Sequence, residues 1–308
     1  MKGSDYVKSN HSISNFNTSE SWIVLSDIEK SIKNKIEAVG TPLKDWNVQI
    51  NYGIKTGYND AFIINSDKRK EILSCCNDAV ERNRTAELIR PILRGKDILR
   101  YEYAWADKYL IATFPSLHYD INLYPAVKNY LLTFGMERLE QTGKTYKLNG
   151  EIIKARKKTN NKWFEIQDSI SYWDDFNKPK VMWKIIGCNI NFCFDEHMYI
   201  CNNAVDIMTG DRDVLIQFVG LMNSKLFDWY LKLTTEAEVQ GGGIQLYVTT
   251  LEKTLLKLDF PETLTNIVYQ RINNIVSDED VDNAVFEAYN LSEEEKLFIL
   301  SDKRVNRD

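Results

Sequence analysis

Residues 180–208 read KVMWKIIGCNINFCFDEHMYICNNAVDIM, and this stretch decides the fold class. It holds short apolar runs separated by polar residues, which is typical of consecutive β-strands. The next stretch, from Asp213 to Thr234, changes to helical spacing, with its apolar residues on one broad face. Strands followed by an amphipathic helix predict an α+β fold with irregular mixed sheets and packed helices. The apolar runs are Val181–Ile186, Ile190–Phe194, Met198–Cys201 and Ala204–Met208.

The elements before this stretch follow from the same periodicities. Ser26 and Glu29 form a capping-box pair at the start of the first predicted helix. Pro91 favours extended backbone in the segment Glu87–Ile98. The segment Trp46–Ile64 reads as a strand, a glycine-containing turn and a second strand. Helices are expected over Leu25–Val39, Asp67–Val80 and Tyr124–Glu140, a further strand over Tyr109–Phe114, and an exposed basic loop or arm over Lys144–Lys162.

The two ends of the chain differ from its middle. Residues 1–21 are polar enough to be disordered, and residues 263–308 are expected to form an acidic helical tail, which leaves 22–262 as the main folded region. The net charge of -5 argues against a simple DNA-binding domain, so any contact with nucleic acid must come from local basic surface. No apolar run is long enough to span a bilayer, no signal peptide is evident, and five cysteines do not form a disulfide framework. These features predict a cytoplasmic protein.

The prolines exclude one class of catalytic site. Amino-methyltransferases that act on DNA need two adjacent prolines followed by an aromatic residue, in the loop that holds the flipped base. The six prolines lie at positions 42, 91, 115, 125, 179 and 261, and none is adjacent to another. Gly241–Gly243 is not followed by the helix start that a dinucleotide or S-adenosylmethionine requires, and there is no Walker loop. We therefore expect no catalytic site in this chain.

Two patterns could carry metal chemistry, and each has a simpler interpretation. Glu294-Glu295-Lys296 has the Glu-x-Lys spelling of a nuclease, but it lies at a capped helix start and no Pro-Asp pair accompanies it. A second set has the residue types of a zinc knuckle, although its cysteines equally suit buried strands. This set is Cys188, Cys193, His197 and Cys201. The other histidines, His11 and His118, have no nucleophile or carboxylate arranged around them, and we expect no metal in this chain.

Four stretches are informative in combination, although each is weak alone. They are NYGIKTGYNDAFII (51–64), IRPILRGKDILRY (89–101), WFEIQD (163–168) with FNKPKVMW (176–183) and FD (194–195), and LMNSKLF (221–227) with GGG (241–243) and FP (260–261). In order and spacing they resemble the TaqI-like C-terminal specificity domain of adenine-specific DNA methyltransferases and fused type IIG restriction–modification enzymes. The resemblance covers roughly residues 20–300.

The resemblance implies that residues 22–262 are a target-recognition domain for double-stranded DNA, which reads base edges mostly in the major groove. The catalytic partner in this family is a methyltransferase domain, in the same chain or separate, which flips an adenine and methylates its amino group. That domain is not in the sequence, so we interpret the chain as a fragment, or a separately encoded piece, of a site-specific adenine methyltransferase or restriction endonuclease. S-adenosylmethionine and Mg²⁺ are expected only in the missing catalytic domains.

Candidate DNA-contacting residues come from two of the quoted stretches. Gly53 and Gly57 permit a tight turn from which Lys55, Thr56, Tyr58 and Asn59 would project, unless the turn is only a solvated hairpin tip. In the second stretch the cations alternate along a segment expected to be extended, so that they could share one face. The alternative for them is a structural ion pair with Asp97 or Glu102. These cations are Arg94, Lys96 and Arg100.

Further candidates lie later in the chain. Lys180 and Lys184 lie near Trp183 and could contact DNA. The basic run from Lys154 to Lys162, with Lys157 and Lys158, could follow phosphates or be an ordinary solvated loop. Gln240 and Gln245 flank the glycine triplet and could read adenine, or belong to a flexible loop.

Two other functions remain open at the level of sequence. An enzyme in its own right would need a hidden nuclease or zinc-hydrolase site. A structural or protein-interaction subunit of a restriction or phage-defence complex would need no base readout, and the isoelectric point near 5.5 suits it. One connected basic cleft containing Lys55, Arg94 and Lys184 would favour recognition, whereas scattered lysines would favour interaction.

Overall fold

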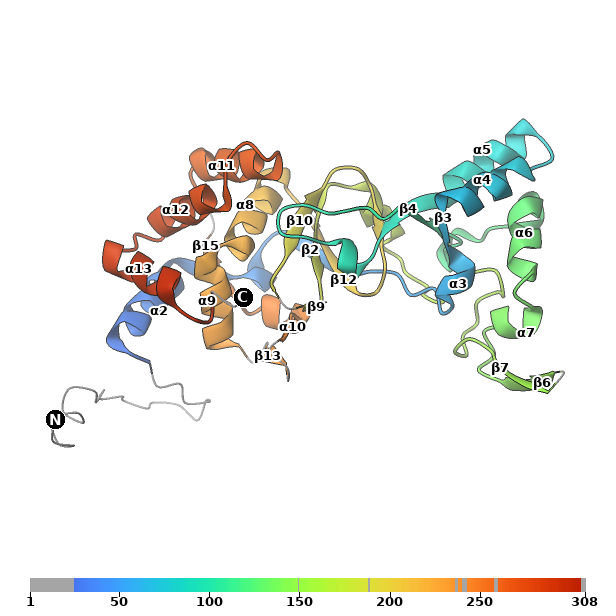
Figure 1. Ribbon diagram of the computed structural model, residues 1–308, viewed down its shortest axis with the longest axis horizontal. Coiled ribbons are helices and arrows are strands. Elements are labelled where there is room, and N and C mark those ends of the chain that lie inside the picture. Colours follow the sequence, from blue (N-terminus) through green and yellow to red (C-terminus); the bar gives the residue numbers. More distant parts are fainter. Residues whose placement is uncertain are drawn as a thin grey trace. The chain divides into compact units, whose positions relative to one another are not determined.

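The computed structural model describes residues 25–305 apart from 149, 188, 236–237, 240–242 and 258–259. The predicted α+β class is confirmed, because helices alternate with several small sheets (Figure 1). The chain divides into two compact units. Unit 1 comprises residues up to 46, 220–238 and from 247 onward, and unit 2 comprises 47–219 and 239–246. The N-terminal segment 1–21 lies outside the described residues.

Unit 2 contains an antiparallel sheet of four strands in the order β10–β8–β12–β2. Cross-strand neighbours place Phe192, Trp183, Asp206 and Tyr52 in one row across it. The apolar runs of residues 180–208 therefore form strands as predicted. The bounds are β2 Val48–Tyr52, β8 Lys180–Lys184, β10 Phe192–Asp195 and β12 Val205–Gly210.

A second sheet of unit 2 has the order β11–β4–β5–β3, and only its β11–β4 pair is parallel. The first strand predicted within Trp46–Ile64 is present, whereas the second is confirmed only from Ile63 onward. Asn59–Phe62 forms the helical turn α3, and the strand that follows pairs with β5 rather than with β2. The apolar run Ala61–Ile64 thus enters the core of a different sheet. The bounds are β3 Ile63–Asn65, β4 Ile89–Leu93, β5 Lys108–Ile111 and β11 Ile200–Cys201.

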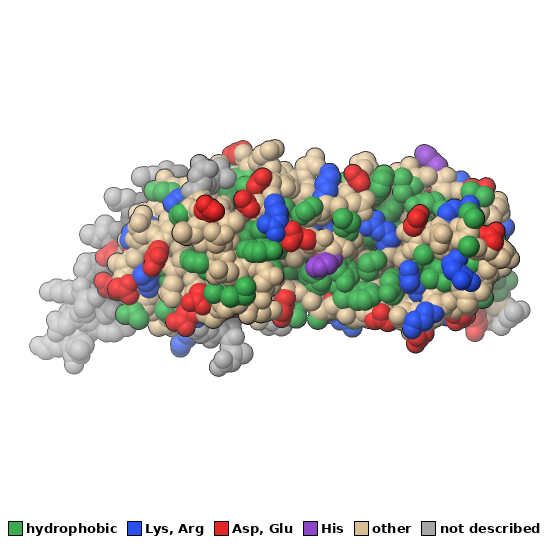
Figure 2. Space-filling model, turned by 90° about the horizontal axis from the view of Figure 1, so that it is seen from above, with side chains coloured by type: hydrophobic (Ala, Val, Ile, Leu, Met, Phe, Trp, Pro, Cys, Tyr) green, Lys and Arg blue, Asp and Glu red, His purple; other side chains and the backbone are tan. Residues whose placement is uncertain are grey.

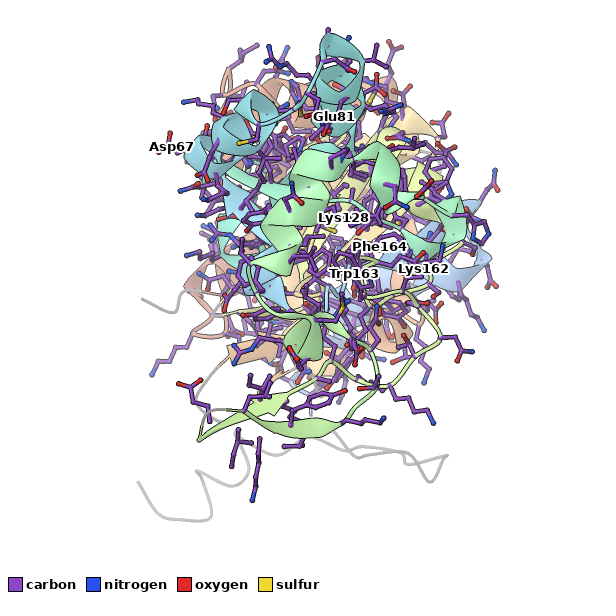
Figure 3. All side chains as sticks on the ribbon, turned by 90° about the vertical axis from the view of Figure 1, so that its right-hand side faces the viewer. Asp67, Glu81, Lys128, Lys162, Trp163 and Phe164 are labelled. Atoms are coloured by element: carbon purple, nitrogen blue, oxygen red, sulfur yellow. The ribbon has the colours of Figure 1, made fainter. Side chains whose placement is uncertain are left out.

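The helices of unit 2 are shorter than predicted. The predicted helix 67–80 is two helices, and the predicted helix 124–140 is interrupted at Gly135, whose φ is +84°. Buried Glu81, labelled in Figure 3, connects the first two of these helices with the next two. Its carboxylate accepts the backbone N–H groups of Asn77 at 2.8 Å and of Ala126 at 2.9 Å. The bounds are α4 Ser66–Ser74, α5 Ala79–Leu88, α6 Pro125–Leu132 and α7 Met136–Leu139.

Two further small sheets contain strands of unit 2. The predicted loop or arm 144–162 contains a two-stranded ribbon, β6 Thr145–Leu148 and β7 Glu151–Lys154, which projects beyond α7 (Figures 1 and 3). Strands β9 Ile186–Gly187 and β14 Gly243–Gln245 pair antiparallel, and β13 Glu238–Val239 borders β14.

Unit 1 is mainly helical. Its first helix has the predicted capping box, with Ile32 and Ile36 buried. The predicted helix 213–234 is two helices, because Ser224 caps the second by accepting the N–H of Phe227. Gly220 lets α8 approach α11, since a Cβ atom there would lie 2.3 Å from Val268. Helix α8, Arg212–Asn223, belongs to unit 1 only from Gly220 onward. The other bounds are α2 Asp27–Val39, β1 Gly40–Pro42, α9 Lys225–Thr234, α10 Val248–Leu251, β15 Leu255–Lys257, α11 Glu262–Ile272, α12 Asp278–Ala288 and α13 Glu293–Ser301. Within the described residues no helix has the length and apolar character that crossing a bilayer requires.

Candidate nucleic-acid interface

The segment from Gly53 to Tyr58, which we call the central turn, is held against the β11–β12 connection. Gly53 donates its N–H to the carbonyl of Val205 at 2.9 Å, and Ile54 donates to Cys201 at 2.8 Å. A Cβ atom at Gly53 would lie 2.0 Å from the carbonyl oxygen of Asn202, so only glycine permits this approach. Asn203 donates its N–H to Ile54 and is thereby brought beside Lys55.

Two further contacts hold the central turn from other sides. The N–H of Lys55 donates to the carboxylate of Asp168 at 2.9 Å, and the N–H of Asp168 donates back to the carbonyl of Lys55. Arg156, only 4% exposed, donates one guanidinium N–H to the carbonyl of Thr56 at 3.0 Å. The rest of this guanidinium donates to the carbonyls of Leu139, Trp163 and Glu165. The turn is therefore a fixed platform rather than a loose loop.

Three adjoining hollows surround the central turn. One of about 330 Å³ is lined by Tyr52, Lys55, Asp168 and Asn203 among others. A second of about 280 Å³ shares Lys55 and Asn203 with it and adds Asn59 and Gln167. A third of about 410 Å³ shares Gly57 and Tyr58 with the second. The remaining residues that line the third are Arg138, Ile152, Lys154, Ala155, Arg156 and Lys157.

The lining of these hollows is basic although the chain carries a net charge of -5. Its charged side chains are Lys55, Arg138, Lys154, Arg156 and Lys157 against Asp168. On the face in Figure 2, the described basic and acidic side chains are interspersed. The excess of positive charge around the central turn is thus a local feature of unit 2. We call the surface formed by the central turn and the three hollows the candidate interface.

The predicted residues of the central turn divide between exposed and structural positions. Lys55 is exposed, and so is Asn59, which begins α3 directly after the turn. Tyr58 is half-buried, and its hydroxyl accepts a hydrogen bond from Arg138 at 3.2 Å. The prediction for Thr56 is wrong, because its side chain is buried and donates to Asn59 at 2.7 Å while accepting the N–H of Tyr58. Thr56 shapes the turn and has no surface to offer to a ligand.

The cations predicted from the second stretch, Arg94, Lys96 and Arg100, do not share one extended face. Gly95–Asp97 is a 3₁₀ turn, so the expected alternation along 94–100 is wrong. Arg94 forms a bidentate ion pair with Asp97, with both contacts at 2.9 Å. This ion pair is the alternative to DNA contact that the sequence left open. Lys96 is exposed, and the guanidinium of half-buried Arg100 lies 5.7 Å from the ring centre of Tyr101. None of the three lines the hollows described above.

Lys180 was predicted to contact DNA, and this is wrong. Its side chain is fully buried, and its ammonium donates to Asp195 at 2.5 Å and to the carbonyl of Phe176 at 3.0 Å. Lys184 is half-buried, and its aliphatic part lies where a Cβ atom of Gly187 would be. A single basic cleft containing Lys55, Arg94 and Lys184 is therefore not found among the hollows around the central turn. Of these three residues, only Lys55 lines them.

The remaining candidates have different positions. Lys157 and Lys158 are both exposed, and Lys157 lines the third hollow. Gln245 lies on β14 opposite Ile186 and is half-buried. Gln240 lies outside the described residues.

Three polar residues of the candidate interface were missed at the sequence level. Arg138 precedes the ribbon in α7, Gln167 follows the core segment at Ile166, and Asn203 lies between β11 and β12. Gln167 lies within a stretch quoted for the family resemblance, which was a signal for it. Arg138 and Asn203 stand in no motif, because only the packing of distant segments brings them to the turn.

The residues considered for metal chemistry are engaged elsewhere. Glu295 is in the capping box of α13 and also accepts from Lys35 at 2.6 Å and from Ser31 at 2.7 Å, so the capped-helix interpretation is confirmed. Cys193 and Cys201 are buried, and this burial raises the pKa of each thiol. Among the described residues no group of three His, Cys, Asp or Glu side chains could hold a metal ion, and Cys188 lies outside them.

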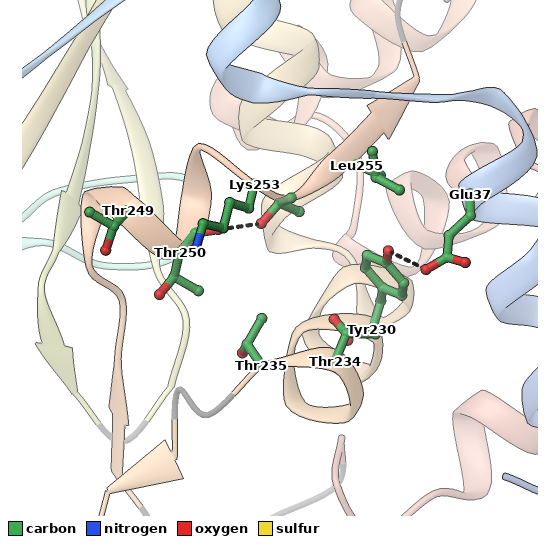
Figure 4. Close-up of a pocket in the computed structure, with 9 residues that line it drawn as sticks. Glu37, Tyr230, Thr234, Thr235, Thr249, Thr250, Lys253 and Leu255 are labelled. Atoms are coloured by element: carbon green, nitrogen blue, oxygen red, sulfur yellow. Dashed lines mark hydrogen bonds between the residues drawn. The ribbon is translucent and has the colours of Figure 1, made fainter. Parts of the chain in front are cut away.

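A separate hollow of about 400 Å³ lies in unit 1 (Figure 4). Several of its polar side chains are already bonded within the protein, since Tyr230 donates to Glu37 at 3.3 Å and Thr254 donates to the carbonyl of Thr250 at 3.1 Å. Thr234 and Thr235 likewise donate to backbone carbonyls of α9. Because these four hydroxyls already donate within the protein, this hollow is a weaker candidate than the interface of unit 2.

Comparison with known proteins identifies the family. The model of the TaqI-like C-terminal specificity domain matches residues 90–254. The chain belongs to this family. The match contains most of the candidate interface, including Arg138, Lys154, Lys157, Gln167 and Asn203, whereas the central turn precedes it. No curated protein sequence matches the chain.

Solved structures with the fold of this specificity-domain chain include two restriction enzymes. The type IIG restriction endonuclease BpuSI matches with a TM-score of 0.52 and 11% identity, over 88% of this chain and 32% of that chain. The type IIL restriction–modification enzyme MmeI, solved in complex with DNA, matches with a TM-score of 0.52 and 12% identity, over 85% and 35%. The chain therefore spans about a third of each enzyme, and the likeness is one of fold.

Proposed function

We propose that this chain is a DNA sequence-recognition module that positions duplex DNA for a separate adenine methyltransferase domain. The observation that carries the proposal is that three hollows meet at the central turn. Together their linings contain both cations and side-chain amides. Lysine and arginine side chains bind phosphates and release their counterions, whereas asparagine and glutamine pair bidentately with adenine. Lys55 and Lys157 would then anchor the backbone, and Asn59, Gln167 and Asn203 would read base edges.

The comparisons support this proposal at the level of family and fold. The matching family model is that of a specificity domain, and one enzyme of the same fold has been solved with DNA. A methyltransferase domain, in the same chain or in another, would bind S-adenosylmethionine and supply the methyl transfer. Mg²⁺ would serve an accompanying nuclease domain, and we place the protein in the cytoplasm, with cellular DNA.

The test is the salt dependence of duplex binding by the full chain. For a randomised pool of short duplexes, we expect log K to fall linearly with log salt between about 50 and 200 mM. Replacing both Lys55 and Lys157 by alanine should lower the slope by about 2, one for each lost phosphate contact. The matched control is Lys44→Ala, an exposed lysine of unit 1. Binding that stays flat with salt would contradict the proposal and favour a protein-interaction subunit.

A further inference from the structure

The β6–β7 ribbon has two unlike faces. Its register pairs Thr145 with Lys154 and Lys147 with Ile152, so these four side chains lie on one face. All four are exposed, and Ile152 is 69% exposed. The opposite face carries Tyr146 and Ile153, which are half-buried. We call the first set the outer face of the ribbon.

The ribbon is held firmly at its root. Tyr146 donates its hydroxyl to the carboxylate of Glu140 at 2.8 Å. Ala155 donates its N–H to the carbonyl of Lys144 at 2.9 Å, and Gly143 donates to the carbonyl of Arg156 at 2.8 Å. Arg156 in turn is bonded to the central turn through Thr56. The outer face is therefore presented in a fixed position relative to the candidate interface.

The outer face combines an apolar centre with positive charge. Lys147 lies opposite Ile152 and Lys154 lies two residues beyond it, while the acidic residue of the ribbon, Glu151, is on the other face. Ile152 and Lys154 also line the third hollow, which contains Arg138 and Lys157. An isoleucine this exposed contributes little to folding. Cations around an apolar side chain complement a polyanion that has apolar groups within its groove, as DNA has.

We propose that the ribbon enters the major groove of duplex DNA with its outer face toward the bases, and that Ile152 contacts the 5-methyl group of a thymine. The major groove, about 12 Å wide, admits a two-stranded ribbon, and it is the groove in which thymine presents its 5-methyl group. Lys147 and Lys154 then donate to guanine acceptors or to phosphates on either side of that thymine. This inference rests on the proposed function, and it makes Ile152 a specificity-determining residue.

The test uses the full chain and a thymine that lacks its methyl group. The best-bound duplex is first selected from a randomised pool by the unmodified protein, and deoxyuridine then replaces each thymidine in turn. At one position we expect the affinity to fall about fourfold, the contribution of one buried methyl group. Ile152→Ala should lose affinity for the thymidine duplex and lose the discrimination at that position alone. The matched control is Ile275→Ala, an isoleucine 70% exposed in unit 1, which should behave like the unmodified protein.

Two outcomes overturn the inference in distinguishable ways. If the unmodified protein shows no thymidine dependence at any position, or if Ile152→Ala keeps it, the ribbon does not read a methyl group, even though salt-dependent binding persists. If the pool yields no salt-dependent binding at all, the proposed function fails together with the inference. The comparison with Ile152→Ala requires that this variant keeps the unfolding midpoint of the unmodified protein, as its exposed position predicts.

Discussion

The ammonium nitrogen of Lys180 on β8 lies 2.5 Å from the carboxylate of Asp195 on β10, and neither side chain has exposed surface. Opposing positions of the antiparallel register carry the two residues. The carboxylate also accepts the backbone N–H groups of His197 at 2.9 Å and Tyr199 at 3.0 Å. With its hydrogen bonds satisfied in this way, the pair fixes the β10–β8 edge of the sheet and the turn that follows β10.

Removing one member of this pair should destabilise unit 2 strongly. Lys180→Met leaves the charge of Asp195 buried without its counter-ion, so the free energy of unfolding should fall by about 3–5 kcal/mol. Urea unfolding measures it. Lys96→Ala, at an exposed lysine, should change stability by no more than about 0.5 kcal/mol. A second change, Asp195→Leu, should recover part of the loss, and a Lys180→Met protein of unchanged stability would contradict the structural assignment.

Asp206 makes stability depend on pH in the opposite sense from a paired carboxylate. It is 1% exposed, and its Oδ1 has no hydrogen-bond partner among the described residues. Burial raises its pKa from 3.8 to about 7. The folded state therefore holds this proton more tightly than the unfolded state. Between about pH 4 and pH 7 unfolding therefore releases this proton. The free energy of unfolding that protonated Asp206 contributes at low pH is lost as the pH rises through this range.

The size of this effect follows from the pKa difference. At about 1.4 kcal/mol per unit, a rise from 3.8 to about 7 corresponds to roughly 4 kcal/mol. Asp206→Asn does not ionise, so the difference in unfolding free energy between variant and unmodified protein should grow in favour of the variant as pH rises through this window. Urea unfolding at about pH 5 and pH 8 measures that difference, in which the other titrating groups cancel. A difference independent of pH would show that Asp206 ionises normally in the folded chain.

Arg156 should be irreplaceable even by lysine. Burial lowers the pKa of its guanidinium to about 10, which leaves it charged at neutral pH, and its forked donors reach four carbonyl groups. Arg156→Lys leaves several of these acceptors unsatisfied, so stability should fall by about 1–3 kcal/mol. The amide protons of β6 and β7 should exchange faster, because the root of the ribbon loosens. Arg138→Lys, at an exposed arginine, is the control and should leave the exchange unchanged.

Replacing an amide residue and replacing a lysine of the candidate interface should have different effects on DNA affinity. Asn203→Ala should weaken binding to the preferred duplex by about 1–3 kcal/mol while hardly changing affinity for random DNA. Lys157→Ala should weaken both alike and lower the salt slope by about 1. Competition between the two duplexes at two salt concentrations separates these effects. If Asn203→Ala weakened both duplexes equally, Asn203 would be a backbone contact and not a reader.

Features set by neighbours in the chain were predictable. The capping box at Ser26 needs only a residue three positions away, and it is present. The capped helix start expected around Glu294–Lys296 is also present, with Ser292 as its cap. The strands of residues 180–208 were read from short apolar runs for the same reason. The ends of helices inside a continuous apolar pattern could not be predicted. The apolar spacing continues through Ser224, but Ser224 caps α9 and so begins a new helix there.

The sequence by itself determined the α+β class, the family and the glycines that allow a tight central turn. Only the tertiary structure decided which polar residues reach a surface. Lys180 and Thr56 are buried, whereas Arg138 and Asn203 join Lys55 from segments far away in the chain. The physical reason is that local spacing fixes the direction of a side chain within its own element. Its burial and its partners depend instead on what packs against that element, as Asp195 packs against Lys180.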